Sequence, residues 1–183
     1  MKAGKTILAF LSAALLLSAN VRVVYHVSVA GETLPGSFSA GMLERCETAA
    51  RAAAAEITQT DGTAAEYAKR AAITLASPDG DVNALTCALL ENAGGVGTAW
   101  AVRVGEADMG NVNDPSAFGE VLESILAENA VPGAVGAEFT ENINLRRVFV
   151  PEESDYDLMA MARAVRGATE VMSVTSDGTV RYG

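Results

Sequence analysis

The first half of the chain, past residue 20, carries a strand pattern and then a helix pattern. Apolar residues alternate with more polar ones at Val23, Tyr25, Val27 and Val29. This alternation predicts a strand that is buried on one face. Apolar residues then recur with the 3.6-residue period of a helix, at Met42, Leu43, Cys46, Ala50, Ala53 and Ile57. Ser39 precedes this helix and is placed to cap its first turn.

The rest of the first half predicts a second strand and a second helix. Residues 70–76 are rich in apolar and β-branched side chains, and the turn residues Pro78, Asp79 and Gly80 follow them. Asp81 is then placed to cap a helix.

The second half predicts the same order of elements. Residues 99–112 contain two strands that pair with each other. Asn113-Asp114-Pro115 predicts a helix start, with a capping residue followed by proline at the first helical position. A long strand is expected over residues 138–150. Asp155 is expected to cap a last helix that ends at Gly167.

Corresponding positions of the two halves lie 70 to 75 residues apart, as Leu43 and Phe118 do, which predicts an internal repeat. The alternative is two unrelated stretches that share an element order. A hairpin is expected around Asp177-Gly178, which either opens a third, incomplete unit or closes the sheet of the second unit. The predicted divisions are residues 1–20, 21–95, 96–168 and 169–183. The predicted fold class is α+β: two similar small units, each a short, mainly antiparallel sheet covered on one face by two helices, with a C-terminal β-hairpin.

The first 20 residues have the pattern of a targeting segment. Lys2 and Lys5 precede residues 6–19, an apolar run of 14 residues without a charge. That run is shorter than the roughly 20 residues needed to span a bilayer, and it suits a secretory signal. An uncleaved N-terminal anchor and a buried helix are the alternatives. The secretory signal and the uncleaved anchor both predict an extracytoplasmic protein, secreted or membrane-anchored at the cell envelope.

Composition excludes several classes of function. The 183-residue chain has 23 acidic and 13 basic side chains, a formal charge of -10, which argues against binding nucleic acid or anionic membrane surfaces. One His and two Cys are too few for a zinc site built on these residues, and they leave little scope for histidine-based catalysis. His26 is therefore expected to be a solvent-facing structural residue, and no cofactor is predicted.

The two cysteines leave a choice open. Cys46 and Cys87 fall on the two predicted helices of the first unit, so a disulfide can form if those helices are neighbours. The alternative is two buried thiols.

The densest acidic cluster precedes the last helix, at Glu152, Glu153, Asp155 and Asp157. Closely spaced carboxylates are a weak candidate for a Ca²⁺ site. The competing interpretation is that they cap the helix and interact with its dipole.

Two segments of the second half are similar to segments of a known protein module. These are Val102-Arg-Val-Gly-Glu-Ala-Asp-Met-Gly-Asn-Val112 and Ile143-Asn-Leu-Arg-Arg-Val-Phe-Val-Pro-Glu-Glu153. The pattern of turns and strand ends resembles the non-catalytic repeat module that precedes the catalytic domain in exported lysostaphin-type zinc metallopeptidases of Gram-positive bacteria, including those with LysM domains. The resemblance covers residues 100–166 best and residues 21–95 more loosely. It implies an envelope location, and the peptidase's zinc ligands have no counterparts in this sequence.

We therefore expect a non-catalytic extracytoplasmic module, a spacer or binding domain associated with cell-wall metabolism. Its expected partners are cell-wall glycan or another envelope protein, and its contact with a membrane is expected only through an uncleaved N-terminal segment. One alternative is a carboxylate-based glycan hydrolase, which would have to pair Glu138 or Glu152 with a second carboxylate. Another is an adhesion or pilus-associated interaction protein.

Overall fold

A computed structural model of the chain describes residues 21–182, and it shows the predicted α+β fold. The chain divides into two compact units, the first ending at Val96 and the second beginning at Gly97. The predicted signal peptide or anchor, residues 1–20, lies outside the described residues. Over residues 21–182, no helix is both long enough and apolar enough to cross a bilayer.

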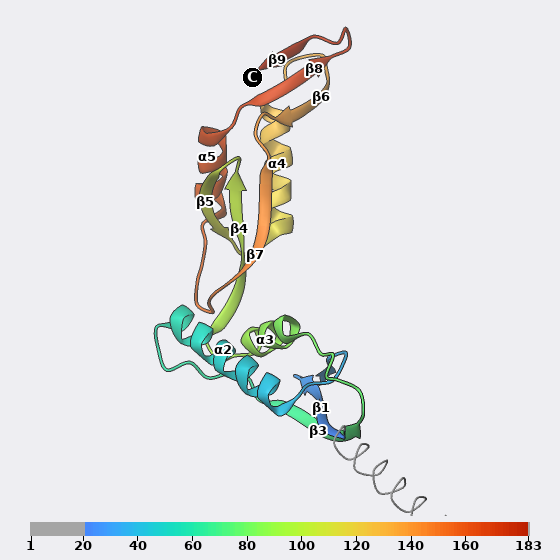
Figure 1. Cartoon of the computed structure of the whole chain (residues 1–183). Helices are drawn as coiled ribbons and strands as arrows, with labels where there is room; N and C mark the ends of the chain where they lie inside the picture. Colours follow the sequence, from blue (N-terminus) through green and yellow to red (C-terminus); the bar gives the residue numbers. More distant parts are fainter. Residues whose placement is uncertain (1–20, 183) are drawn as a thin grey trace, which may run out of the picture. The chain divides into compact units, whose positions relative to one another are not determined.

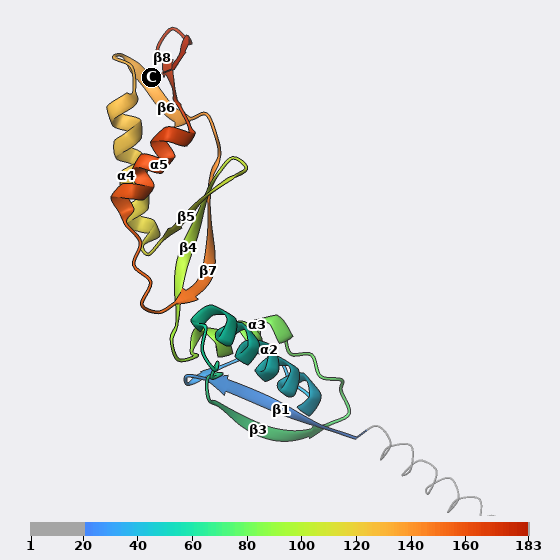
Figure 2. The same ribbon diagram turned by 90° about the vertical axis from the view of Figure 1, so that its left-hand side faces the viewer.

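The first unit is a three-stranded antiparallel sheet covered on one face by two helices (Figures 1 and 2). Its elements are β1 (Arg22–Val29), β2 (Glu32–Thr33), α2 (Ala40–Thr58), β3 (Tyr67–Thr74) and α3 (Val82–Glu91). The strand order is β2-β1-β3, so β1 is central. Val27, Val29, Phe38, Leu43, Cys46, Ala50, Leu85 and Leu89 form the core between sheet and helices.

Both helices of the first unit begin at the predicted caps. The Ser39 hydroxyl accepts a hydrogen bond from the Met42 amide at 3.2 Å, and the Asp81 carboxylate accepts from the amides of Asn83 and Ala84. Each cap satisfies amides that a helix leaves without partners in its first turn.

The expected buried face of β1 is correct for Val27 and Val29 but wrong for Val23, which is exposed. Val24, on the opposite face, is buried instead. Val23 lies outside the core that the helices cover, whereas the segments around Leu34 and Ser77 flank Val24. Tertiary packing therefore overrides the alternation at the start of this strand.

The second unit contains two small sheets and two helices. Its elements are β4 (Val96–Val104), β5 (Ala107–Val112), α4 (Pro115–Asn129), β6 (Ala134–Phe139), β7 (Ile143–Pro151), α5 (Leu158–Ala168), β8 (Val171–Thr175) and β9 (Val180–Tyr182). One sheet has the order β5-β4-β7 and the other β6-β8-β9. Both helices lie on one side of the β5-β4-β7 sheet (Figure 2), and Phe118 and Val165 pack beneath them against Val102.

The single long strand expected over residues 138–150 is wrong, because the chain forms β6 and β7 in two different sheets. The Thr140 amide donates to the Glu170 carbonyl at 2.9 Å, which holds the end of β6 beside the start of β8. Two residues later, the Asn142 carbonyl accepts from the Gly105 amide at 2.9 Å, which holds the start of β7 beside the β4–β5 turn. The two ends of this short link thus bond to different partners, and the chain changes sheets between them.

The boundaries of α5 also differ from the expected ones. Its N-cap is Asp157 rather than Asp155, because the Asp157 carboxylate accepts from the amides of Met159 and Ala160. The helix continues through Gly167, which does not cap it, and Thr169 is the C-cap.

The C-terminal hairpin is confirmed. Strand β8 pairs with β9 on one side and with β6 on the other, so the hairpin completes a sheet of the second unit. In its turn, the Asp177 carboxylate accepts hydrogen bonds from the Thr175 hydroxyl and the Thr179 amide. These bonds, the Thr175 hydroxyl first among them, lower the pKa of Asp177 from 3.8 to about 2.

This shift predicts how the hairpin turn responds to acid. Because the folded pKa is depressed, the turn bonds stabilise the hairpin fully above pH 3.8 and are lost as the pH falls through about 2. The Thr179 amide shift, followed by NMR in an acid titration, should therefore change with a midpoint near 2. Asp177→Asn should abolish that titration. A midpoint at the ordinary value of 3.8 would contradict the turn geometry.

The two units share features that an internal repeat would produce. In both, the first strand lies between its hairpin partner and the strand that precedes the second helix. Leu43 and Phe118 are both buried four residues after the N-cap of the first helix of their unit. The repeat itself stays a prediction.

Candidate functional site

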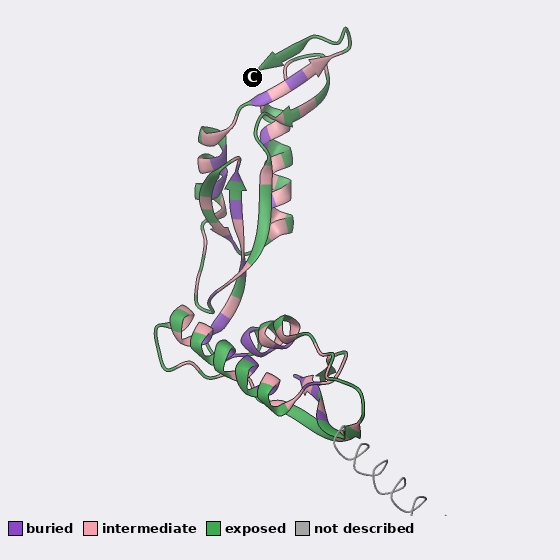
Figure 3. Ribbon diagram, in the orientation of Figure 1, coloured by how far each residue is buried: buried purple, intermediate pink, exposed green. Residues whose placement is uncertain are grey.

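The helix-free face of the β5-β4-β7 sheet carries a shallow hollow of about 260 Å³. Five residues line it: Ala101, Arg103, Asp108, Asn144 and Arg146. In β4, Ala101 and Arg103 alternate with the buried Val102, so their side chains lie on the face away from the helices. Most of β7 is exposed as well (Figure 3).

An irregularity in the β4–β5 pairing decides which residue faces Arg103. Val102 pairs with Gly110, but the next residue, Arg103, pairs with Asp108, so Met109 is the extra residue of a β-bulge. Gly110 adopts a φ of 104°, a value that side chains disfavour. The bulge thus brings a carboxylate, rather than a methionine, opposite the arginine.

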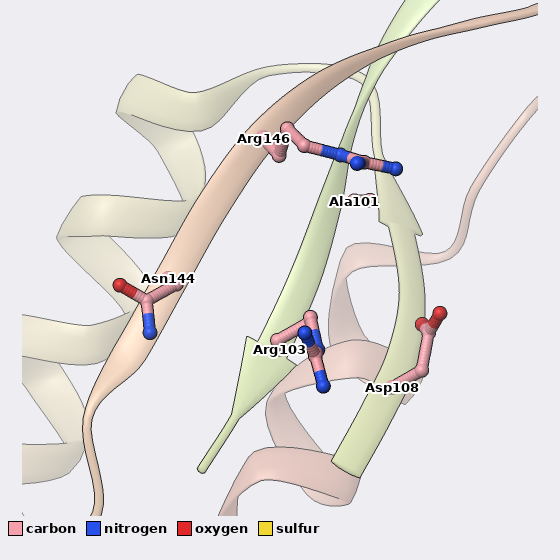
Figure 4. Close-up of a pocket in the computed structure, with 5 residues that line it drawn as sticks. All are labelled: Ala101, Arg103, Asp108, Asn144 and Arg146. Carbon is pink, nitrogen blue, oxygen red and sulfur yellow. The ribbon is translucent and has the colours of Figure 1, made fainter. Parts of the chain in front are cut away.

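The two arginines differ in how they are held. Arg103 Nη2 donates to the Glu106 carbonyl at 3.0 Å and lies 3.7 Å from the Glu106 carboxylate, which is fully exposed and so contributes little. The Arg146 side chain forms no hydrogen bond or ion pair within residues 21–182, and it reaches from β7 across β4 above Ala101 (Figure 4). Its guanidinium donors are therefore available to a ligand.

This arrangement suits a small ligand that carries a carboxylate. A guanidinium presents a planar fork of N–H donors that matches a carboxylate in two parallel hydrogen bonds. Two arginines, one aspartate and one asparagine give the lining a positive charge, in a chain whose total is -10. Asn144 and Asp108 add acceptors for the N–H or O–H groups of the same ligand. The five lining side chains include one carboxylate, that of Asp108, and no Ser, Cys, His or Lys side chain.

A larger hollow of about 480 Å³ lies in the first unit and includes His26, Ser37 and Asp79. Its polar groups bond to one another. His26 Nδ1 lies 3.1 Å from the Gly36 carbonyl, and the Ser37 amide and hydroxyl both donate to the Asp79 carboxylate. The hydroxyl bond is the main cause that lowers the pKa of Asp79. The serine proton is thus directed to a carboxylate of low basicity and not to the histidine, so these three residues do not form a hydrolase triad.

The predicted acidic cluster is distributed along the segment before α5. Glu152 and Glu153 are exposed, Asp155 accepts from the Asn113 side chain at 3.2 Å, and Asp157 caps the helix. Within the described part of the chain, no group of three or more His, Cys, Asp or Glu side chains is placed to hold a metal ion.

Both cysteines are free thiols. Cys46 is buried in the core of the first unit with its Sγ 3.6 Å from the Val82 carbonyl, whereas Cys87 is exposed. The structure therefore contains neither the disulfide nor two buried thiols, since α3 turns its Leu85 and Leu89 face, not Cys87, to the core.

This difference predicts the reactivity of the thiols. In the native chain, a thiol reagent such as Ellman's should modify Cys87 rapidly and leave Cys46 unmodified until the first unit unfolds. Cys87→Ser should remove the fast phase. Two fast equivalents, or none, would contradict the burial of Cys46 or the exposure of Cys87.

The arginine hollow was not predicted from the sequence. Arg103 and Arg146 are 43 residues apart and meet because β4 and β7 are neighbours in one sheet. The available signal was Arg103 between Val102 and Val104, which marks an outward position on a strand with a buried face.

Comparison of the chain with models of protein families, with curated proteins and with solved structures finds no match. The resemblance to the modules of lysostaphin-type peptidases therefore stays a prediction.

Proposed function

We propose that the chain is a non-catalytic extracytoplasmic module of a bacterial envelope protein, and that its second unit binds carboxylate groups of the cell wall. The observation that carries this proposal is the pair of exposed arginines on the open face of the β5-β4-β7 sheet. Carboxylates are abundant on the peptide stems of peptidoglycan. The predicted targeting segment in residues 1–20 supports the location outside the cytoplasm.

The strength of such a site follows from its hydrogen bonds. A hydrogen bond to a charged group contributes about 1.5–3 kcal/mol, so two arginines give modest, reversible binding. Such binding suits a module that positions a larger protein on a repeating polymer, where several weak contacts add together.

Co-sedimentation with purified peptidoglycan tests the proposal. The chain should bind native peptidoglycan, and binding should fall when its free carboxyl groups are converted to amides. The double substitution Arg103→Gln and Arg146→Gln should weaken binding by at least about tenfold, given the hydrogen bonds lost.

Arg181→Gln is the matched control, because Arg181 is an exposed strand arginine of the same unit that lies outside the hollow. It should leave binding unchanged. Equal binding to native and amidated peptidoglycan would argue against the site. So would an equal loss of binding in the double variant and in Arg181→Gln.

A further inference from the structure

Asp108 is the one acidic side chain among the five that line the arginine hollow. Its Oδ1 accepts a hydrogen bond from the Gly110 amide at 3.0 Å, within the bulge of β5. Among residues 21–182, the Asp108 carboxylate has no other hydrogen-bond donor and no ion-pair partner. Its Oδ2 is therefore available to a ligand in the hollow that also holds the donors of Arg146.

The two arginines do not bond to this carboxylate. Arg103 is opposite Asp108 in the pairing of β4 with β5, but its Nη2 donates to the Glu106 carbonyl at 3.0 Å. In Figure 4, the Asp108 carboxylate points toward the end of the hollow where Arg146 lies, whereas the Arg103 guanidinium points away from it. A carboxylate and a guanidinium thus flank the same end of the hollow, and neither has an ion-pair partner in the part of the chain that the structure describes.

The spacing of these groups suits a ligand of about the size of one amino acid. The Arg146 side chain lies above Ala101, and Asp108 is opposite Arg103, two residues further along β4. Residues two positions apart on a strand are about 7 Å apart on the same face, so one small molecule can reach both side chains. The hollow, at about 260 Å³, is also smaller than the roughly 300–1,000 Å³ of sites for drug-sized ligands.

Opposite charges placed in this way complement a ligand that carries both charges. A carboxylate can accept from the guanidinium of Arg146, and an ammonium can donate to the free oxygen of Asp108. We propose that the arginine hollow recognises a zwitterionic amino-acid group, in which a free carboxylate and a free ammonium are on the same carbon. This inference rests on the proposed function and narrows its ligand from any carboxylate to this class.

The ammonium gives the hollow a means of distinguishing peptide stems. A stem offers a zwitterionic group when it contains a diamino dicarboxylic acid whose second amine is free. Acylation of that amine, as in a cross-link, converts the ammonium to an amide and removes its charge. The hollow should therefore prefer stems that are not cross-linked through this amine.

NMR titration of the isotope-labelled full chain with alanine and with N-acetylalanine tests the role of the ammonium. Both ligands carry the carboxylate, but only alanine carries the ammonium. Alanine should bind about three- to fivefold more tightly, which is what a favourable exposed ion pair contributes. Asp108→Asn should abolish this preference, and its side-chain oxygen can still accept from the Gly110 amide, so the bulge is retained.

Glu106→Gln serves as the control, because Glu106 is an exposed acid that lies 3.7 Å from Arg103 Nη2 but does not line the hollow. It should leave the preference for alanine unchanged. Equal affinity of the native chain for the two ligands would overturn this inference, while the carboxylate site itself would stand. An equal gain in affinity for both ligands in Asp108→Asn would also overturn it, since Asp108 would then only offset the charge of the arginines. If neither ligand shifts the signals of β4 and β7, the proposed function fails as well.

Discussion

Phe118→Ala should lower the free energy of unfolding of the second unit by about 3–5 kcal/mol, which combines the lost burial of the ring with the cavity left behind. Phe118 is fully buried, at the fourth position of α4, and packs in one cluster with Val102, Val112 and Val165. Strands and helices both contribute to that cluster, so its collapse around a cavity is restricted.

Trp100 makes this measurement specific to the second unit. It is the only tryptophan of the chain, and it packs against the cluster that contains Phe118. Denaturant unfolding of Phe118→Ala, followed by tryptophan emission, should therefore show the full loss of unfolding free energy. Val135→Ala, at an exposed position of β6, should shift the same transition by no more than about 0.5 kcal/mol. Equal shifts in the two variants would show that Phe118 is not a core residue.

Gly80→Ala should destabilise the first unit by about 1–3 kcal/mol through overpacking. A Cβ at Gly80 would lie 2.5 Å from the ring of Phe38, which is itself buried in the core. The backbone of this turn is held to the segment that carries Phe38, because the amides of Asp79 and Gly80 both donate to the Ser37 carbonyl, at 3.1 and 2.8 Å. Neither the ring nor the loop can move away at low cost.

Gly41→Ala provides a control of opposite sign. A Cβ at Gly41, the second residue of α2, meets no atom within 4 Å, and alanine favours a helix over glycine by at most about 0.5–1 kcal/mol. Thermal unfolding followed by circular dichroism should thus give a lower midpoint for Gly80→Ala and a higher one for Gly41→Ala. A stabilising Gly80→Ala would contradict the contact with Phe38.

Sequence patterns predicted the fold where local signals and tertiary contacts agree. The caps at Ser39, Asp81 and Asp114 are local, because a short polar side chain bonds amides two or three residues ahead, and all three are confirmed. The hairpin at Asp177-Gly178 is local in the same sense.

The errors arise where distant partners decide the structure. Val23 follows the alternation of a buried face, but it lies beyond the part of the sheet that the core covers. Residues 138–150 have the composition of one strand, yet Thr140 and Asn142 bond to different partners, and the chain is divided there between two sheets. Neither effect has a signal within the segment itself.

The candidate site was also missed, because the total charge of a chain does not show how its charged side chains are arranged. A formal charge of -10 predicts repulsion between this chain and acidic polymers, but a total cannot show which side chains meet. Arg103 and Arg146 gather on one face through strand pairing, and a β-bulge places Asp108 opposite Arg103. The total charge therefore gave no indication of the arginine pair, which became apparent only through the sheet.

NMR of the isotope-labelled full chain, titrated with acetyl-alanyl-alanine and with its C-terminal amide, tests the carboxylate site most directly. The free carboxylate should shift the amide signals of Ala101, Arg103, Asn144 and Arg146 in a saturable manner, and the neutral amide should not. These shifts should diminish with added salt, which screens the interaction with exposed arginines. Shifts that the amide reproduces, or that gather away from β4 and β7, would contradict the proposal that this sheet face binds carboxylates.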